Sequence, residues 1–148
     1  SVRMLFREYS CKNAGVAGFA EAFTSEERKE RLNRKETGAV YEQAAAEYLE
    51  QQGCRILEKN FRSRYGEIDL VAEEAGTLVF VEVKYRTAVT IQYPEEAVNR
   101  SKQKKICRTA DYYRLRRRIP DDVPCRFDVI AITPEGITQY RNAFAYCR

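Results

Sequence analysis

The 148-residue sequence contains no histidine, and this absence excludes several classes of enzyme site. Ser-His-Asp hydrolases, Cys-His proteases, His-ligated zinc sites and nuclease motifs that depend on histidine all lose their central residue. Any acid–base chemistry in this protein must therefore use carboxylates, lysine, tyrosine or water.

The cysteines and the apolar runs give little support for export or for a membrane span. The five cysteines are widely spaced, odd in number and contain no Cys-x-x-Cys pair, so neither a disulfide framework nor a zinc site is indicated. No apolar run approaches the ~18 residues of a membrane-spanning helix. Residues 14–23 resemble a signal sequence only weakly, because two glycines and a glutamate interrupt them. We expect a reduced, cytoplasmic protein without a membrane partner.

The chain length suits one domain with an appendage. Residues 1–36 show no sustained hydrophobic period and are expected to form an N-terminal extension, partly helical and flexible. The folded domain is then expected at residues 37–148. Thr24 and Glu27 have the spacing of a capping box, which predicts the start of a polar helix. Gly38 is expected to end that helix before a second one begins.

The remaining pattern predicts three strands, a helix and two further strands, with short turns inside both groups of strands. This order predicts an α/β fold with a central mixed five-stranded sheet flanked by helices. The expected ranges are strands at 54–61, 66–73 and 77–85, a helix at 94–118, and strands at 125–133 and 136–140.

Two charged residues interrupt the most apolar stretch of the chain, residues 78–84. A carboxylate and an ammonium in such a strand need partners or a metal ion. Because strand side chains alternate, Glu82 and Lys84 face the same side. Asp69 lies in the preceding predicted strand, and pairing of the two strands would bring it close to Glu82.

Two carboxylates held together repel each other unless a proton or a divalent cation lies between them. Mg²⁺ or Mn²⁺ suits such a pair, because Mg²⁺ accepts one or two carboxylates and keeps several waters for phosphate exchange. Asp69, Glu82 and the carbonyl of Val83 are the candidate ligands. Lys84 would position a water or stabilise developing negative charge. The alternative is an exposed cross-strand ion network that only keeps a sheet end soluble.

Basic residues are concentrated in residues 95–118, which contain nine Lys or Arg against three acids. Such a patch is typical of polyanion binding, although charge runs are often only solvated surfaces. Lys102 falls in the apolar row of the predicted helix and either extends out of the core or points toward the acids. The expected nucleic-acid contacts are Arg62, Arg64, Arg86, Lys102, Lys104, Lys105 and Arg108.

Five further residues have two possible roles each. Glu67 shares a strand face with Asp69 and is a secondary site candidate, or it simply pairs with Arg62 or Arg64. The other four could stack on unpaired bases, or they could be ordinary core residues: Tyr65, Tyr85, Tyr112 and Tyr113.

The sequence resembles the YraN-like proteins, a family placed in the PD-(D/E)XK nuclease superfamily and related to archaeal Holliday junction resolvases. The resemblance covers about residues 37–146. One departure is Tyr41, where the family commonly has glycine. The matching residues are Gly38, Glu42, Ala45, Tyr48-Leu49, Gly53, Ile56-Leu57, Asn60, Gly66-Glu67-Ile68-Asp69-Leu70, Leu78-Val79-Phe80-Val81-Glu82-Val83-Lys84, Arg86, Ala110, Arg126-Phe127-Asp128-Val129-Ile130 and Asn142-Ala143-Phe144.

The resemblance implies a restriction-endonuclease-like core with the order αβββαβ. It also implies that Asp69 and Glu82 bind the metal, that Lys84 is the lysine of the motif and that Glu42 is the helix glutamate completing the site. The implied activity is metal-dependent hydrolysis of DNA phosphodiester bonds, and the implied substrates include branched or Holliday junction DNA. A homodimer is suggested by analogy with the resolvases. The alternatives are a non-catalytic nucleic-acid-binding module that retains the fold, and a scaffold for a protein partner.

Overall fold

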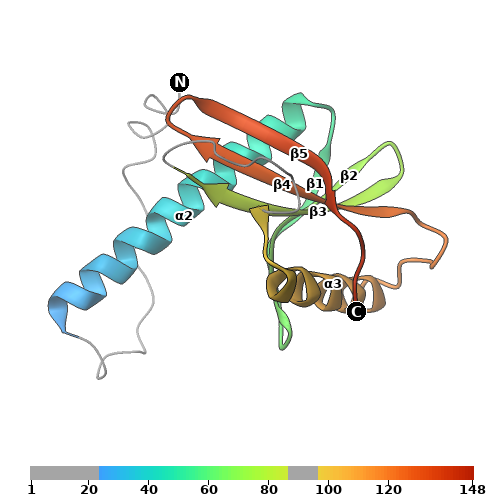
Figure 1. Cartoon of the computed structure of the whole chain (residues 1–148), viewed down its shortest axis with the longest axis horizontal. Helices are drawn as coiled ribbons and strands as arrows, with labels where there is room; N and C mark the ends of the chain where they lie inside the picture. The colour runs from blue at the N-terminus through green and yellow to red at the C-terminus, as the bar shows by residue number, and fades with distance from the viewer. Residues whose placement is uncertain (1–23, 87–96) are drawn as a thin grey trace.

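The computed structural model describes residues 24–86 and 97–148, and it shows two helices and a five-stranded sheet (Figure 1). The sheet is mixed, so the predicted α/β class is confirmed. The elements are α2 (Ser25–Gln51), β1 (Arg55–Ser63), β2 (Gly66–Glu74), β3 (Thr77–Tyr85), α3 (Arg100–Arg116), β4 (Cys125–Thr133) and β5 (Gly136–Phe144).

The strands lie in chain order, β1-β2-β3-β4-β5. Neighbours pair antiparallel except β3 and β4, which are parallel and are therefore joined by a crossover that contains α3. Helix α3 packs on one face of the sheet and α2 on the other (Figure 1). Neither of these two helices is long and apolar enough to cross a membrane.

The alternation predicted for β3 is confirmed. Phe80 belongs to the core cluster beneath α3, where its ring stacks on Phe127 at a centroid distance of 5.7 Å. Val79 and Val81 belong to the other cluster, beneath Leu49 of α2. Because Glu82 follows Phe80 by two residues, its side chain leaves the sheet on the α3 side.

Helix α2 is continuous, so the predicted interruption at Gly38 is wrong. Its start is as expected: the Thr24 hydroxyl accepts a hydrogen bond from the Glu27 N–H (3.2 Å), and the Glu27 carboxylate accepts one from the Thr24 N–H (2.8 Å). An isolated glycine lowers helix propensity without ending a helix, and here no cap residue follows it. The N-terminal half of α2 extends beyond the sheet (Figure 1).

Two other predicted boundaries are corrected. Helix α3 begins at Arg100 rather than residue 94, because Asn99 is extended and its side chain caps the helix by accepting from the Lys102 N–H (2.9 Å). Strand β5 continues to Phe144 instead of ending at residue 140, because a bulge at Asn142 (φ 51°) lets the chain rejoin β4. Residues 1–23 and 94–96, on which other expectations fall, lie outside the described residues.

A glycine inside a continuous helix should be replaceable by alanine with a gain in stability. A Cβ added at Gly38 meets no atom within 4 Å. We expect Gly38→Ala to raise the free energy of unfolding by about 0.5–1 kcal/mol, since alanine loses less backbone entropy on folding. Urea unfolding followed by circular dichroism measures it.

The matched control is Gly53→Ala, where φ is +91° and a side chain is strained. This variant should be destabilised. A loss of stability in Gly38→Ala would show that the helix does not run through this position.

Candidate active site

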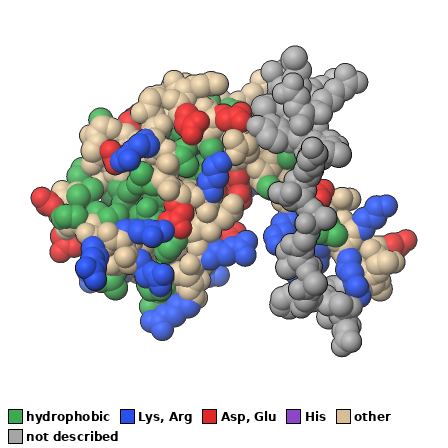
Figure 2. Space-filling model, turned by 180° about the vertical axis from the view of Figure 1, so that it is seen from behind, with side chains coloured by type: hydrophobic (Ala, Val, Ile, Leu, Met, Phe, Trp, Pro, Cys, Tyr) green, Lys and Arg blue, Asp and Glu red, His purple; other side chains and the backbone are tan. Residues whose placement is uncertain are grey.

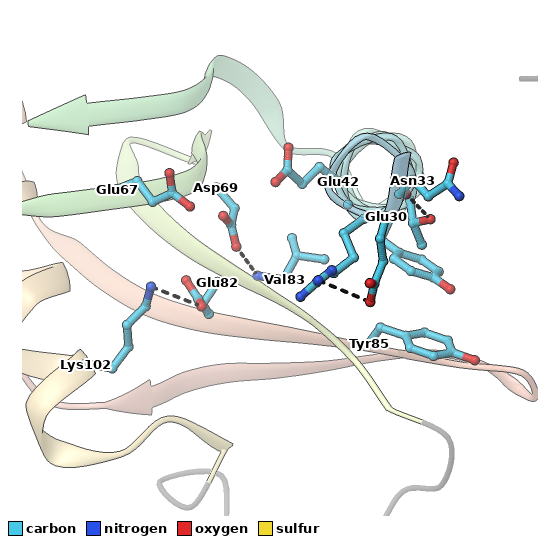
Figure 3. Close-up of a pocket in the computed structure, with 13 residues that line it drawn as sticks. Glu30, Asn33, Glu42, Glu67, Asp69, Glu82, Val83, Tyr85 and Lys102 are labelled. Carbon is cyan, nitrogen blue, oxygen red and sulfur yellow. Dashed lines mark hydrogen bonds and ion pairs between the residues drawn. The ribbon is translucent and has the colours of Figure 1, made fainter. Parts of the chain in front are cut away.

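A cleft of about 520 Å³ opens between α2, the ends of β2 and β3, and the start of α3 (Figure 3). Its floor carries the carboxylates that the sequence singled out. The residues that line it include Glu42, Glu67, Asp69, Glu82, Tyr85 and Lys102.

Asp69 is held by the backbone of the neighbouring strand. The pairing of β2 with β3 ends at Leu70 and Val81, two residues before Val83. The Val83 N–H is thereby free to donate to Asp69 Oδ2, at 2.8 Å (Figure 3). Asn60, which lies opposite Asp69 in β1, has φ 53° and marks a local distortion of that strand. The carboxylate is thus fixed where regular strand pairing stops.

Asp69 and Glu82 lie side by side on β2 and β3 and both line the cleft, close enough for each carboxyl group to shift the pKa of the other. Both residues are buried, with exposed fractions of 8% and 7%. Burial, followed by the neighbouring Asp69 charge, raises the pKa of Glu82 to about 7. Burial also raises the pKa of Asp69, although the hydrogen bond from Val83 partly opposes it. At neutral pH the two acids therefore compete for a proton.

Two lysines approach the same oxygen of Glu82. Lys84 Nζ and Lys102 Nζ each lie 3.6 Å from Glu82 Oε1. Their charges lower the pKa of Glu82, but less than burial and Asp69 raise it. Of the two roles left open for Lys102, the structure favours the one directed at the acids (Figure 3). Positive charge thus reaches Glu82 from α3, through Lys102, as well as from β3, through Lys84.

Glu42 projects from α2 toward the same cleft (Figure 3). Burial raises its pKa, a hydrogen bond with the Asn60 side chain lowers it, and the charges of Asp69 and Glu67 raise it further. Glu42 is therefore close enough to interact electrostatically with the pair. Within residues 24–86 and 97–148, however, no three acidic or thiol side chains converge closely enough to form a ready metal cluster.

The other predicted contacts lie on the β1–β2 hairpin, directly after β3, and on α3. Glu67 takes the paired role, with its carboxylate 3.3 Å from Arg62 Nε. The Arg64 guanidinium donates to the Tyr65 hydroxyl (2.6 Å), and that of Arg86 donates to a backbone carbonyl (3.1 Å). Lys104, Lys105 and Arg108 are exposed on α3.

Sequence reasoning missed the contribution of the N-terminal half of α2. Glu30 and Arg34 form an ion pair (3.2 Å) that lines the cleft, although both were assigned to the extension. Tyr41 stacks on Tyr85 with a centroid distance of 4.5 Å and an angle of 13°. The departure of Tyr41 from the family pattern was a usable signal for this contact, whereas the polar helix gave none.

The donor set fits a hard divalent cation. Two carboxylates in contact supply anionic oxygens, and one shared proton would have to leave when a cation binds. The N–H and C=O of a strand residue face the same neighbouring strand, so the Val83 carbonyl is directed to the Asp69 side. These oxygen donors suit Mg²⁺ or Mn²⁺ better than zinc, which favours nitrogen and sulfur.

Comparisons with known proteins agree on one family. The model described as "Uncharacterised protein family UPF0102" matches residues 41–132. A UPF0102 protein of Lachnoclostridium phytofermentans is 52% identical over 113 residues, covering 76% of this chain and 96% of that protein. Another, of Persephonella marina, is 48% identical over 72% of this chain and 91% of its own length. A third, of Clostridioides difficile, is 41% identical over 76% of this chain and 100% of that protein.

The raised pKa of Glu82 should make the stability of the metal-free protein depend on pH. Its folded pKa of about 7 exceeds the ordinary value of 4.5, so the folded state binds more protons between these values. The free energy of unfolding therefore falls as pH rises through this window. We expect Glu82→Gln to exceed the parent protein in stability at pH 8 by on the order of 1–3 kcal/mol. The advantage should shrink toward pH 4.5.

Urea unfolding in the presence of a chelator, repeated across the pH range, measures this difference. Glu73→Gln, in a solvent-accessible pair with Arg55 on the same sheet, serves as the control. A stability difference between Glu82→Gln and the parent that stays constant with pH would contradict the assigned pKa.

Proposed function

The chain belongs to the uncharacterised protein family UPF0102, and from its paired buried acids we propose that it is a divalent-metal-dependent endonuclease hydrolysing DNA phosphodiester bonds. The observation that supports this most is the contact between the Asp69 and Glu82 carboxyl groups inside an open cleft. Strongly perturbed carboxylates in a cleft are characteristic of functional sites.

In this proposal Asp69, Glu82 and the carbonyl of Val83 hold Mg²⁺ or Mn²⁺. When bound, the cation would lower the pKa of a water and neutralise charge on the scissile phosphate. Glu82 would have to lose its proton to hold the cation, and with a pKa of about 7 this costs little free energy at neutral pH. Asp69 stays oriented throughout by its hydrogen bond from the Val83 N–H.

The two lysines next to Glu82 have separate tasks. Without substrate, both ammonium groups compensate the charge of Glu82. With a cation bound at the acids, Lys84 would be free to orient the attacking water or to stabilise the developing charge. Lys102, whose side chain projects from α3, would be free to bind a phosphate oxygen. Glu42 assists from α2, at the edge of the cleft, by attracting the cation.

The surface of α3 supports DNA as the substrate. Lys104, Lys105 and Arg108 are exposed on α3, the helix that also carries Lys102 of the cleft, and can neutralise phosphates. Figure 2 shows Lys and Arg side chains gathered over one part of this face of the molecule. Branched or Holliday junction DNA, and a symmetric homodimer to cut it, follow from the resemblance to resolvases.

We also propose a reducing, cytoplasmic setting, because the five cysteines are odd in number, widely spaced and without a Cys-x-x-Cys pair.

Cleavage assays test the proposal directly. With Mg²⁺ or Mn²⁺, we expect cleavage of at least one among linear, single-stranded, flapped and four-way DNA. Glu82→Gln and Asp69→Asn should each lower the cleavage rate by at least about 100-fold. Loss of a metal ligand should reduce activity at least as much as loss of a group that hydrogen-bonds to a ligand. Glu73→Gln should keep parental activity because it lies outside the cleft.

DNA binding measured against salt distinguishes the alternatives. Salt-dependent DNA binding, with no cleavage of any substrate in the presence of either metal, would favour a non-catalytic binding module. Absence of salt-dependent binding would instead favour a scaffold for a protein partner.

Metal binding has its own test by calorimetry with Mn²⁺. We expect one ion to bind at the acid pair, and Glu82→Gln to weaken binding by at least about tenfold. Because Glu82 shares a proton near neutrality, binding at pH 6.5 should release more protons than binding at pH 8.5. Titrations in two buffers of different ionisation enthalpy measure the release. Equal release at both pH values would rule out displacement of a shared proton.

A further inference from the structure

One side of α3 carries a stripe of residues that leads away from the acid pair. Lys105, Arg108, Tyr112 and Leu115 recur every three or four positions, so they share one side of the helix. Lys102 lies one turn before Lys105, at the border with the buried side, and its ammonium pairs there with the Glu82 carboxylate at 3.6 Å. The opposite side, including Ile106 and Tyr113, is buried in the core.

The turn between β1 and β2 runs beside this stripe. A Cβ added at Gly66 would lie 3.4 Å from the Thr109 hydroxyl and 3.6 Å from Lys105 Cβ, so the turn packs directly on α3. The contact places Tyr65 next to Tyr112, with ring centroids 6.3 Å apart and planes at 68°. Two tyrosines from distant parts of the chain thus form one surface.

A shallow groove of about 300 Å³ lies at this surface, distinct from the acid cleft. Besides the two rings it is lined by Arg108, Asp111 and Leu115. Both rings are half-buried, whereas the Leu115 side chain is 77% exposed.

One guanidinium group lies over each of the two rings. Arg64 lies over the Tyr65 ring at 4.8 Å, and Arg116 lies over the Tyr112 ring at 5.8 Å. The acid of the groove, Asp111, accepts a hydrogen bond from the Tyr146 hydroxyl (2.6 Å). The groove therefore combines aromatic rings with a surplus of positive charge.

We propose that this groove binds unpaired nucleotides of a DNA strand that runs from the acid pair along α3. Surfaces for single strands combine aromatic rings, on which bases stack, with cations that follow the backbone. The phosphates of duplex DNA could bind the cations, but its bases are stacked on one another and leave no free face for the rings.

The dimensions agree with one continuous strand. Ten residues separate Lys102 from Tyr112, or about 15 Å along the helix at 1.5 Å per residue. That length corresponds to roughly four nucleotides at the duplex rise of 3.4 Å each, and to fewer nucleotides in an extended single strand. Lys105 and Arg108 lie between these points and are exposed for phosphate contact. The inference narrows the proposed nuclease to substrates with a single-stranded arm, and in that respect rests on the proposed function.

Binding of a fluorescently labelled oligo-dT by the full chain tests the groove, with chelator present so that no cleavage occurs. Tyr112→Ala should weaken binding by roughly 5- to 100-fold, the effect of losing one stacked base. Tyr112→Phe should bind as the parent does, because the ring remains. Asp111→Asn should bind more tightly, because it removes a negative charge while keeping an acceptor for Tyr146.

Tyr48→Ala is the matched control, since Tyr48 is a half-buried tyrosine on α2 that packs on the other core cluster. It should leave oligo-dT binding unchanged. Circular dichroism of each variant shows whether it is folded. Parental affinity in a folded Tyr112→Ala would overturn the proposal, as would an equal loss of affinity for blunt duplex DNA.

The two proposals can fail separately. Tyr112-dependent binding of oligo-dT without cleavage of any substrate would leave the groove in place and remove the nuclease. Metal-dependent cleavage that is indifferent to single-stranded arms and to Tyr112→Ala would keep the nuclease and remove the groove.

Discussion

The contact between the carboxyl groups of Asp69 and Glu82 determines what the rest of this molecule can do. It arises because β2 stops pairing with β3 at Leu70, so that the Val83 N–H is left for Asp69. Two buried acids in contact cannot both be ionised without a compensating cation. The end of a strand ladder, a local backbone feature, thereby creates a site that attracts positive charge: a proton, a lysine ammonium or a divalent ion.

A second group of buried charges in the same sheet shows what a satisfied site looks like. Asp128 is fully buried, yet it accepts hydrogen bonds from the Arg126 guanidinium, the Gln139 amide and the Asn142 N–H. Glu74 pairs with Arg126 at 2.7 Å, and hydrogen bonds from arginine lower its pKa. These acids have the partners that buried carboxylates need. Asp69 and Glu82 instead have raised pKa values and face a cleft, which sets them apart from this structural network.

Much of this arrangement could be predicted from the sequence because short-range rules govern it. The alternation of side chains placed Glu82 opposite Val81, and the tight β2–β3 turn brought Asp69 near it. The continuity of α2 through Gly38 was missed because helix propensity at one glycine differs by only about 1 kcal/mol, which the surrounding helix outweighs. The position of Lys102 could not be predicted, because it depends on how α3 crosses the sheet.

Helix α3 links the acid pair to the aromatic groove, and it does so rigidly. Its buried side packs Ile106, Ala110 and Tyr113 against the sheet, with the Tyr113 ring edge-on to Phe80 at 5.8 Å. Since Phe80 and Glu82 are two residues apart on β3, the same packing fixes both the acid and the helix that approaches it. A side chain on a rigid helix loses little freedom when a ligand binds. The spacing between the acid pair and the rings is thus a property of the hydrophobic core, and a DNA strand bound as proposed must match it.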